Sequence, residues 1–146
     1  MAKLQFTMER GGVLTAGIFV DRVPETWKAI QTMLPHTATA LNARWSGREF
    51  FSPMVIPEKP PRENQTHHAS LGDIIYACER PDDRQFTGFE AIGLFYGAES
   101  INDWRGPFAV NWIGRIDPSQ WELIEAIGDR IFRHGGEQCE IRVIED

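Results

Sequence analysis

The sequence predicts a mainly β fold, in which two helices pack on a closed or nearly closed, mostly antiparallel barrel. Three observations support this prediction. Short segments with the apolar or alternating pattern of strands recur along the whole chain, separated by turn residues. Only two segments show the apolar spacing of an amphipathic helix. The order of these segments lacks the strand–helix–strand alternation of a parallel sheet, so we expect about seven or eight antiparallel strands.

Composition indicates a single domain that spans residues 1–146. The 146 residues suffice for one core, and no linker or internal repeat divides them. The net charge is −6 and the basic residues are scattered, which argues against a nucleic-acid partner. No apolar run approaches the roughly 20 residues of a membrane span, and the N-terminus lacks a signal-peptide pattern. Cys78 and Cys139 have no metal-binding spacing, so we expect reduced thiols in a cytoplasmic protein.

The N-terminal quarter predicts a β-hairpin followed by a short helix. Residues 4–8 alternate between apolar and polar side chains, a Gly-Gly pair supplies the turn, and residues 13–20 return as a second strand. Pro24 suits the first turn of a helix. The apolar side chains of this helix recur at spacings of four, three and four residues, and Pro35 ends it.

A second hairpin is predicted over residues 38–52, with a tight turn at Ser46 and Gly47. Residues 53–70 follow as a polar loop that contains four prolines. Loops of this length in a compact domain often act as lids or binding loops. We therefore expect this loop to be able to cover a site.

The C-terminal half predicts three strands, a helix and a final strand. The segments 74–78, 89–96 and 108–116 are predicted strands, and the first is nearly all apolar, as expected for a strand that is buried on both faces or that closes a barrel. Asp117 is followed at once by a proline and three residues later by a glutamine, which predicts the start of a helix. Two glycines end this helix, and residues 139–144 form the last strand.

Four short motifs occur along the chain in a recognisable order: Arg44-Trp45-x-Gly47-x-Glu49, Gly72-Asp73-Ile74-x-Tyr76, Phe95-Tyr96-Gly97 and Asn111-x-x-Gly114-Arg115-Ile116. With the helices between them, they resemble a family of small, uncharacterised bacterial proteins with a cyclophilin-like β-barrel. The resemblance covers nearly the whole chain and implies the fold rather than an activity. True cyclophilins carry a Phe-x-Arg strand signature that this sequence lacks. Residual peptidyl-prolyl isomerase activity therefore stands only as an alternative.

The second hairpin is the leading candidate for a binding site. Two arginines, one carboxylate and three large aromatic residues fall within the nine residues 43–51. Arg44 could bind carboxylate or carbonyl oxygens of a ligand in the barrel mouth, with Trp45 and Glu49 beside it. The alternative is a cross-strand salt bridge between Arg44 and Glu49 next to a core tryptophan.

Three further residues are candidates for the pocket wall. Either Phe95 or Tyr96 would face the ligand, depending on a strand register that the sequence does not fix. Asn111 is a lone amide in an apolar strand, and a buried amide must be hydrogen-bonded. It either ties down a neighbouring loop, the interpretation that we favour, or faces the ligand.

If the protein is an enzyme, Glu49 or His68 is the candidate base and Arg44 the group that stabilises a developing oxyanion. His67 and His68 are adjacent and would point to opposite sides of an extended segment. No further ligand stands at a metal-binding spacing, so neither a metal site nor a cofactor is predicted.

The leading hypothesis is a small-molecule-binding barrel, with an enzyme on a small polar metabolite that carries a carboxylate or an amide as its more specific form. The alternative is a structural or protein-interaction barrel that forms a homodimer. In that case Trp45, Trp104 and Trp112 would form an interface instead of a pocket.

Overall fold

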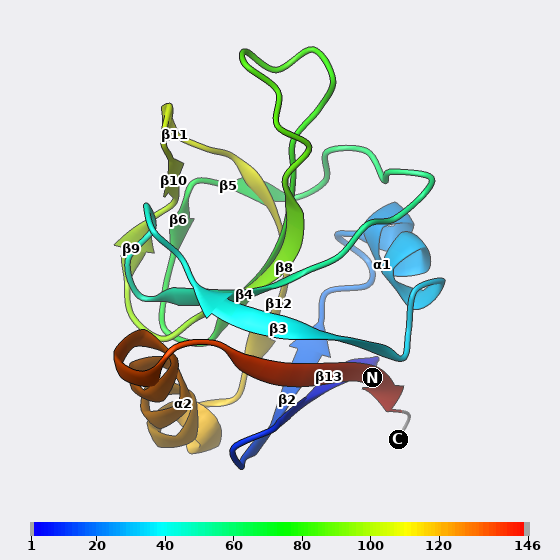
Figure 1. The fold of residues 1–146 in the computed structure, drawn as a ribbon. Helices are drawn as coiled ribbons and strands as arrows, with labels where there is room; N and C mark the ends of the chain where they lie inside the picture. The colour runs from blue at the N-terminus through cyan, green and yellow to red at the C-terminus, as the bar shows by residue number, and fades with distance from the viewer. Residues whose placement is uncertain (1, 145–146) are drawn as a thin grey trace.

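Eight antiparallel strands close into a barrel in the computed structural model, which describes residues 2–144 (Figure 1). Around the barrel the strands are β2 (Val13–Ile18), β1 (Lys3–Met8), β13 (Glu137–Ile144), β3 (His36–Asn42), β4 (Glu49–Pro53), β8 (Glu90–Phe95), β7 (Asp73–Cys78) and β12 (Val110–Ile116). Pairing of β12 with β2 closes the ring, and the short strand β5 (Gln65–Thr66) adds to the edge of β12. This architecture confirms the predicted fold class.

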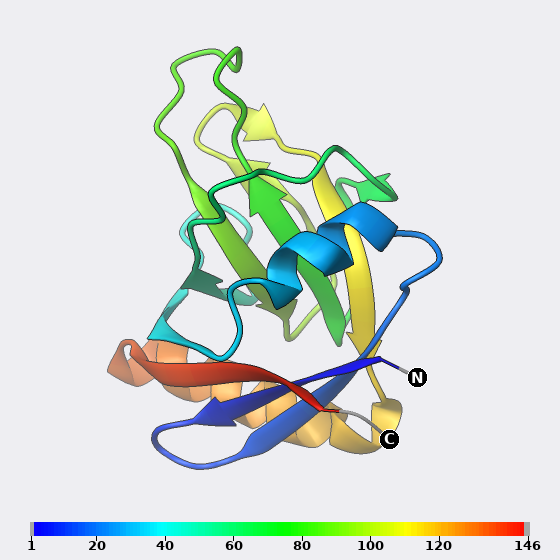
Figure 2. The ribbon, with the colours of Figure 1, turned by 90° about the vertical axis from the view of Figure 1, so that its right-hand side faces the viewer.

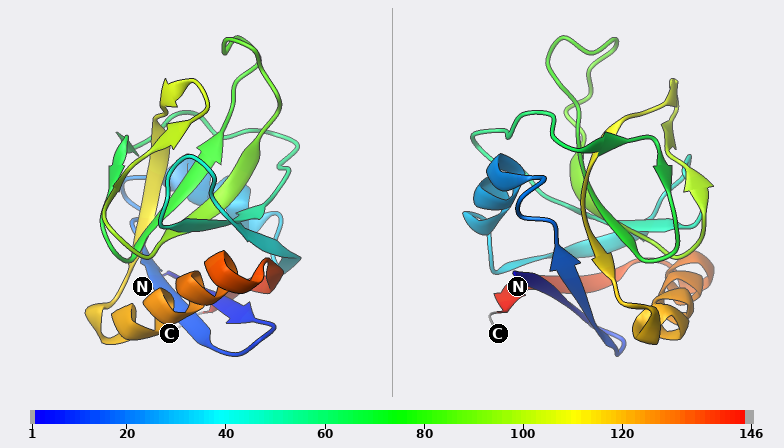
Figure 3. Two further views of the ribbon diagram at one scale, coloured as in Figure 1. Left: turned by 60° about the vertical axis from the view of Figure 1, so that its left-hand side comes forward. Right: turned by 180° about the vertical axis from the view of Figure 1, so that it is seen from behind.

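Two helices accompany the barrel, as predicted, and lie well apart from each other (Figures 1 and 3). Helix α1 (Pro24–Gln31) runs beside β12 (Figure 2). Asp117 caps a 3₁₀ turn, η1 (Pro118–Gln120), by accepting a hydrogen bond from the Ser119 backbone N–H at 3.0 Å. This turn leads directly into α2 (Trp121–His134). Within residues 2–144, neither helix has the length and apolar character that crossing a membrane requires.

The main core fills the inside of the barrel. Every one of the eight strands contributes a buried apolar side chain to it, among them Leu14, Leu4, Cys139, Ala40, Phe50, Ile92, Tyr76 and Ile113. Ile30 of α1 and Ile127 of α2 belong to the same cluster. The helices are therefore held by the apolar stripes that the sequence predicts for them.

A second, smaller apolar cluster lies on the outer face of the barrel wall. Because side chains alternate along a strand, the neighbours of the inward-facing residues in β7 and β8 point outward. These outward residues, together with apolar residues of the covering segments, form the cluster Ala69, Ile75, Ala77, Phe95, Ile101 and Val110. The covering segments contain the short strands β6 (His68–Ala69), β9 (Glu99–Ser100), β10 (Asn102–Asp103) and β11 (Gly106–Pro107). Strands β7 and β8 are consequently buried on both faces.

Two connections differ from the sequence prediction. The segment 53–70 is not an unbroken loop, since it contains β5 and β6. The turn between β3 and β4 is not tight either. Their last backbone contact is the hydrogen bond from Ala43 N to Glu49 O at 2.8 Å, which leaves five residues in the loop. The predicted two-residue turn is wrong because the loop bonds to a distant segment: the Ser46 hydroxyl contacts the backbone of Asn102.

Candidate functional site

A cavity of about 310 Å³ lies on the outer face of the barrel wall. Outward-facing side chains of β4, β7 and β12 line it, among them Phe51, Ile75 and Val110. Their strand neighbours Phe50 and Tyr76 point into the barrel interior. This cavity therefore does not lie at the mouth of the barrel, where we expected the site. The sequence could not distinguish the two faces, since both faces of these strands are apolar.

Three connecting segments complete the walls of the cavity. They are residues 43–46 between β3 and β4, residues 79–89 between β7 and β8, and residues 101–108, which carry β10 and β11. The β7–β8 connection projects from the barrel near β10 and β11 (Figure 1). Large aromatic side chains from all three segments line the cavity, namely Trp45, Phe89, Trp104 and Phe108. The site is thus an apolar, ring-lined cavity with a few polar groups.

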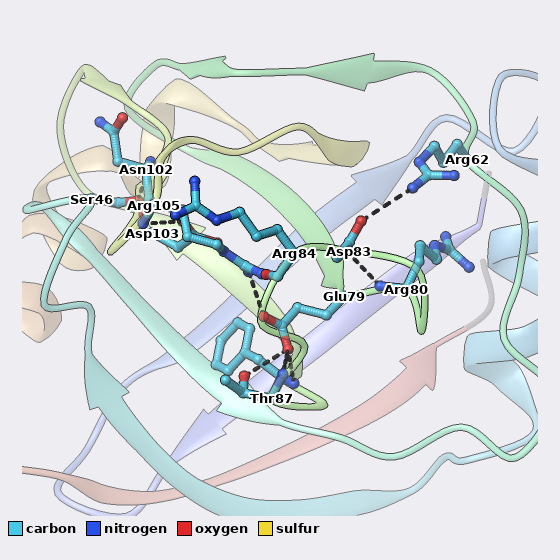
Figure 4. A network of polar contacts seen from close by, with 11 residues as sticks. Ser46, Arg62, Glu79, Arg80, Asp83, Arg84, Thr87, Asn102, Asp103 and Arg105 are labelled. Atoms are coloured by element: carbon cyan, nitrogen blue, oxygen red, sulfur yellow. Dashed lines mark hydrogen bonds and ion pairs between the residues drawn. The ribbon is translucent and has the colours of Figure 1, made fainter.

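Polar contacts fasten the three segments to one another (Figure 4). The Ser46 hydroxyl donates to the carbonyl oxygen of Asn102 and accepts from its N–H, both at 3.0 Å. The guanidinium of Arg105 donates to Asp103 Oδ2 at 2.6 Å and also to Glu79 Oε1. The cavity walls are therefore connected by the chain's own residues.

Three carboxyl groups line the cavity, those of Glu79, Glu49 and Asp103, and the hydrogen-bonding capacity of Glu79 is taken up internally. Its Oε2 accepts from Thr87 Oγ1 at 2.6 Å, from Thr87 N at 2.8 Å and from Phe89 N at 2.9 Å, while Arg105 binds Oε1. Burial raises the pKa of Glu79, but the hydrogen bonds from Thr87, Phe89 and Arg105 outweigh burial and lower it to about 2. Glu79 therefore acts as a structural anchor for the β7–β8 connection.

Glu49 is the second carboxyl group of the cavity, and its surroundings are the opposite. Glu49 is only 7% exposed, and within residues 2–144 no cation forms an ion pair with its carboxyl group. Burial raises the pKa of Glu49 to about 8, and the nearby Ser46 hydroxyl offsets only part of this rise. At neutral pH Glu49 is mostly protonated. Two carboxyl groups with pKa values pushed far apart therefore line one cavity, an arrangement typical of functional sites.

Arg44 and Trp45, the other two hairpin candidates, lie at the same cavity as Glu49. Both side chains are exposed and contribute to the lining. Within the described chain, Arg44 makes no ion pair with Glu49, so the alternative cross-strand salt bridge is not present. The structure thus brings the three residues together around one space.

Phe95 and Tyr96 do not line the cavity. Phe95 is fully buried in the outer apolar cluster. Tyr96 packs instead on helix α2, where a Cβ at Gly128 would come within 2.2 Å of its ring, and its hydroxyl donates to Asn42 Oδ1. The strand register therefore directs both side chains to packing positions.

Asn111 lies outside the cavity lining and ties the segment 53–70 to the barrel. Its Nδ2 donates to Thr26 Oγ1 and to Pro61 O, each at 3.0 Å, and its Oδ1 accepts from Glu63 N and Gln65 Nε2, each at 3.1 Å. All four hydrogen-bonding positions of the amide are used. No residue of the segment 53–70 lines the cavity.

His67 and His68 are exposed and stand outside the cavity lining, with ring centroids 5.7 Å apart. Among residues 2–144, no group of three or more His, Cys, Asp or Glu side chains is placed to hold a metal ion. Of the candidate bases, only Glu49 therefore borders the cavity.

Several cavity residues were missed in the sequence. Glu79 and Thr87, together with Arg105, which binds Glu79 without lining the cavity, fall in segments that resemble ordinary charged turns. The only available signal is the position of Glu79 directly after a fully apolar strand. Its pairing with Arg105, 26 residues away, depends on the folded chain.

The chain is similar in structure to two proteins of known structure. One is McbB in complex with tryptophan, with a TM-score of 0.73 and 13% identity; the match covers 95% of this chain but only 44% of the McbB chain. The other is the hypothetical protein AF2241 from Archaeoglobus fulgidus, with a TM-score of 0.62 and 25% identity over 96% of this chain and 92% of that one. No curated protein sequence matches the chain. Residues 6–143 match the model of the DUF3830 family, proteins of unknown function, and the chain therefore belongs to this family of uncharacterised proteins.

Proposed function

We propose that the protein binds a small molecule in the cavity beside Glu49. The observation that supports this most directly is the combination of a ring-lined cavity of about 310 Å³ with a buried carboxyl group that has no cationic partner among residues 2–144. Ligand sites are typically apolar clefts of this size that contain a few well-placed polar groups. Structural carboxyl groups, in contrast, are paired in the way that Glu79 is paired.

The lining suggests the shape of the ligand. Phe51, Phe89, Trp104 and Phe108 suit a compact, flat apolar body such as one or two rings. Arg44 is exposed at the cavity and has no ion-pair partner in the described chain, so it suits carboxylate or amide oxygens at the outer end of the ligand. The ligand would thus be a small metabolite with one apolar and one polar part.

The complex of McbB with tryptophan provides a further reason to test aromatic compounds. At 13% identity the likeness concerns the fold alone, and this chain spans less than half of the McbB chain. The proposal therefore depends on the cavity of this protein, not on the ligand of McbB.

The test is a binding screen with one-ring and two-ring aromatic compounds, with and without a carboxylate. Trp45 and Trp104 line the cavity, so their fluorescence should change when it fills. Substitution Ala77→Phe places a ring inside the cavity, whereas Val13→Thr changes an exposed residue on the distant β1–β2 hairpin. Wild type and Val13→Thr should bind equally and Ala77→Phe at least tenfold more weakly. A folded Ala77→Phe protein that binds as wild type would overturn the proposal.

A homodimer is the second candidate, and the exposed aromatic side chains near the cavity support it. Trp45, Phe86, Phe89 and Trp104 are all large and exposed. Trp112 does not join them, because its ring packs against Phe19 with centroids 4.9 Å apart. Light scattering over a wide range of concentrations tests this candidate. A dimer that Trp104→Ser dissociates would support it, and a monomer throughout would exclude it.

A cytoplasmic location also belongs to the proposal. Cys78 and Cys139 are both free thiols, as expected in a reducing compartment. Fractionation of cells that express the tagged, full-length protein tests this location, and recovery outside the cytoplasm would refute it.

A further inference from the structure

We propose that the ligand of this cavity carries a basic nitrogen and that its ammonium group pairs with the carboxylate of Glu49. This inference rests on the proposed function, since it specifies the class of molecule that the same cavity would take.

The first argument is that Glu49 has the main unused hydrogen-bonding capacity inside the cavity. The Ser46 hydroxyl is held by the backbone of Asn102, and the Thr87 hydroxyl donates to Glu79. Glu79 in turn accepts four hydrogen bonds. A polar group that enters the cavity therefore finds its free partner at Glu49.

The second argument concerns the charges that face the cavity. Glu79 and Asp103 share one cation, Arg105, so these three side chains together carry one net negative charge, which also favours a cation in the cavity. Arg44 is exposed to solvent, which screens its charge. No charged residue contributes to the raised pKa of Glu49, which has burial as its main cause and is offset only in part by the nearby Ser46 hydroxyl. The carboxylate form of Glu49 therefore lacks a counter-charge in the described chain, and a bound cation would supply it.

The third argument is that both the walls and the energetics favour a cation. Aromatic rings such as those of Phe51, Phe89 and Trp104 attract ammonium groups, most strongly where water is excluded. With a pKa of about 8, ionising Glu49 at pH 7 reduces the apparent affinity only by about tenfold. The gain in affinity from an ion pair with a buried carboxylate can exceed this tenfold loss.

The experiment compares three small probes on the full chain: 2-phenylethylamine, its neutral analogue 2-phenylethanol, and phenylacetate. Binding is measured by isothermal titration calorimetry from pH 6 to pH 9, in buffers with different ionisation enthalpies. The affinity for the amine should increase with pH, by up to about tenfold per pH unit below pH 8, and should level off near pH 8. At pH 7 its binding should release close to one proton.

Variant Glu49→Gln serves as the matched comparison. It should bind the amine at least tenfold more weakly than wild type at pH 8, without the rise in affinity between pH 6 and pH 8, whereas the loss for 2-phenylethanol should be much smaller, because a neutral hydroxyl forms no ion pair with Glu49. Because the proton release is measured on the wild-type chain, the test does not depend on the stability of the variant.

The two proposals fail in different ways. If 2-phenylethanol binds and Ala77→Phe abolishes its binding, but the amine shows neither proton release nor a rise in affinity with pH, the basic-nitrogen inference is wrong and the cavity remains a binding site. The same conclusion follows if phenylacetate binds at least as tightly as the amine at pH 8. If none of the three probes binds, both proposals fail for ligands of this class.

Discussion

The carboxyl group of Glu49 lies directly over Gly93. A Cβ atom added at position 93 would come within 2.1 Å of Glu49 Oε2 and within 2.9 Å of Ile75 Cδ1. Contacts below 3.0 Å are essentially never observed for real Cβ atoms. In the sheet, Gly93 stands between Phe51 of β4 and Ile75 of β7, both of which line the cavity. The missing side chain of Gly93 thus creates the space in which Glu49 is seated.

Substitution Gly93→Ala should displace the Glu49 carboxyl group and destabilise the protein by about 1–3 kcal/mol, since the added methyl group overpacks a buried site. In a Glu49→Ala background the clash with the carboxyl group is gone and only the contact with Ile75 Cδ1 remains, so the cost of Gly93→Ala should fall by more than half. Urea denaturation of the two single variants and the double variant measures this coupling. Equal costs of Gly93→Ala in both backgrounds would show that the two residues are independent.

Glu49→Gln should change the pH dependence of stability. The pKa of Glu49 is about 8 in the folded protein and 4.5 ordinarily, so between these values the unfolded chain has lost a proton that the folded chain retains. The stability of the wild type should therefore fall as the pH rises from about 4.5 to 8. The stability of Glu49→Gln lacks this decline. Its free energy of unfolding relative to that of the wild type should therefore rise by up to roughly 4 kcal/mol between these two pH values. Urea denaturation at pH 5 and pH 8 measures this difference in stability. If the stabilities of the two proteins change equally between pH 5 and pH 8, the expectation is wrong.

Arg105→Met should be among the most damaging substitutions at the cavity. It leaves the buried Glu79 and its neighbour Asp103 without their cation, a loss of about 2–4 kcal/mol in the free energy of unfolding. Arg48→Met is the matched control, because the pair of Arg48 with Glu99 is largely exposed and should be worth under about 1 kcal/mol. Similar losses for the two variants, measured by urea denaturation, would refute the anchoring role of Arg105.

Arg44→Ala should leave stability within about 0.5 kcal/mol of the wild type, because its side chain is exposed and makes no ion pair in the described chain. Its effect should appear in binding. An aromatic probe with a carboxylate should bind about two- to fivefold more weakly, in line with the modest strength of exposed ion pairs. Calorimetric titrations of this variant and of Arg48→Ala provide the comparison. If Arg44→Ala binds carboxylates as well as the wild type does, Arg44 has no part in the site.

Local patterns account for what could be predicted from the sequence. Alternation, apolar runs and proline or glycine signals predicted the closed barrel and both helices, since each signal acts within a few residues. Arg44, Trp45 and Glu49 could be singled out because they share one hairpin. The location of the cavity could not be predicted, because β7 and β8 are apolar on both faces and their periodicity does not show which face remains open. Long-range partners such as Arg105 were hidden for another reason: its contact with Glu79 joins residues 26 positions apart, which no local pattern reports.

Asn111 provides a test of whether the segment 53–70 and the cavity are independent. Substitution Asn111→Leu removes four hydrogen bonds that join this segment and α1 to β12, and it leaves the buried Thr26 hydroxyl with one partner fewer. We expect a loss of about 2–4 kcal/mol and faster hydrogen exchange over residues 61–66.

Gln65→Ala is the matched control for Asn111→Leu, because it removes one of the four bonds from an exposed residue and should cost under about 1 kcal/mol. No residue of the segment lines the cavity, so the affinity for an aromatic probe should stay within twofold of the wild type in both variants. A large loss of affinity in folded Asn111→Leu would show that the segment shapes the cavity after all, and would restore the covering role that the sequence suggested for it.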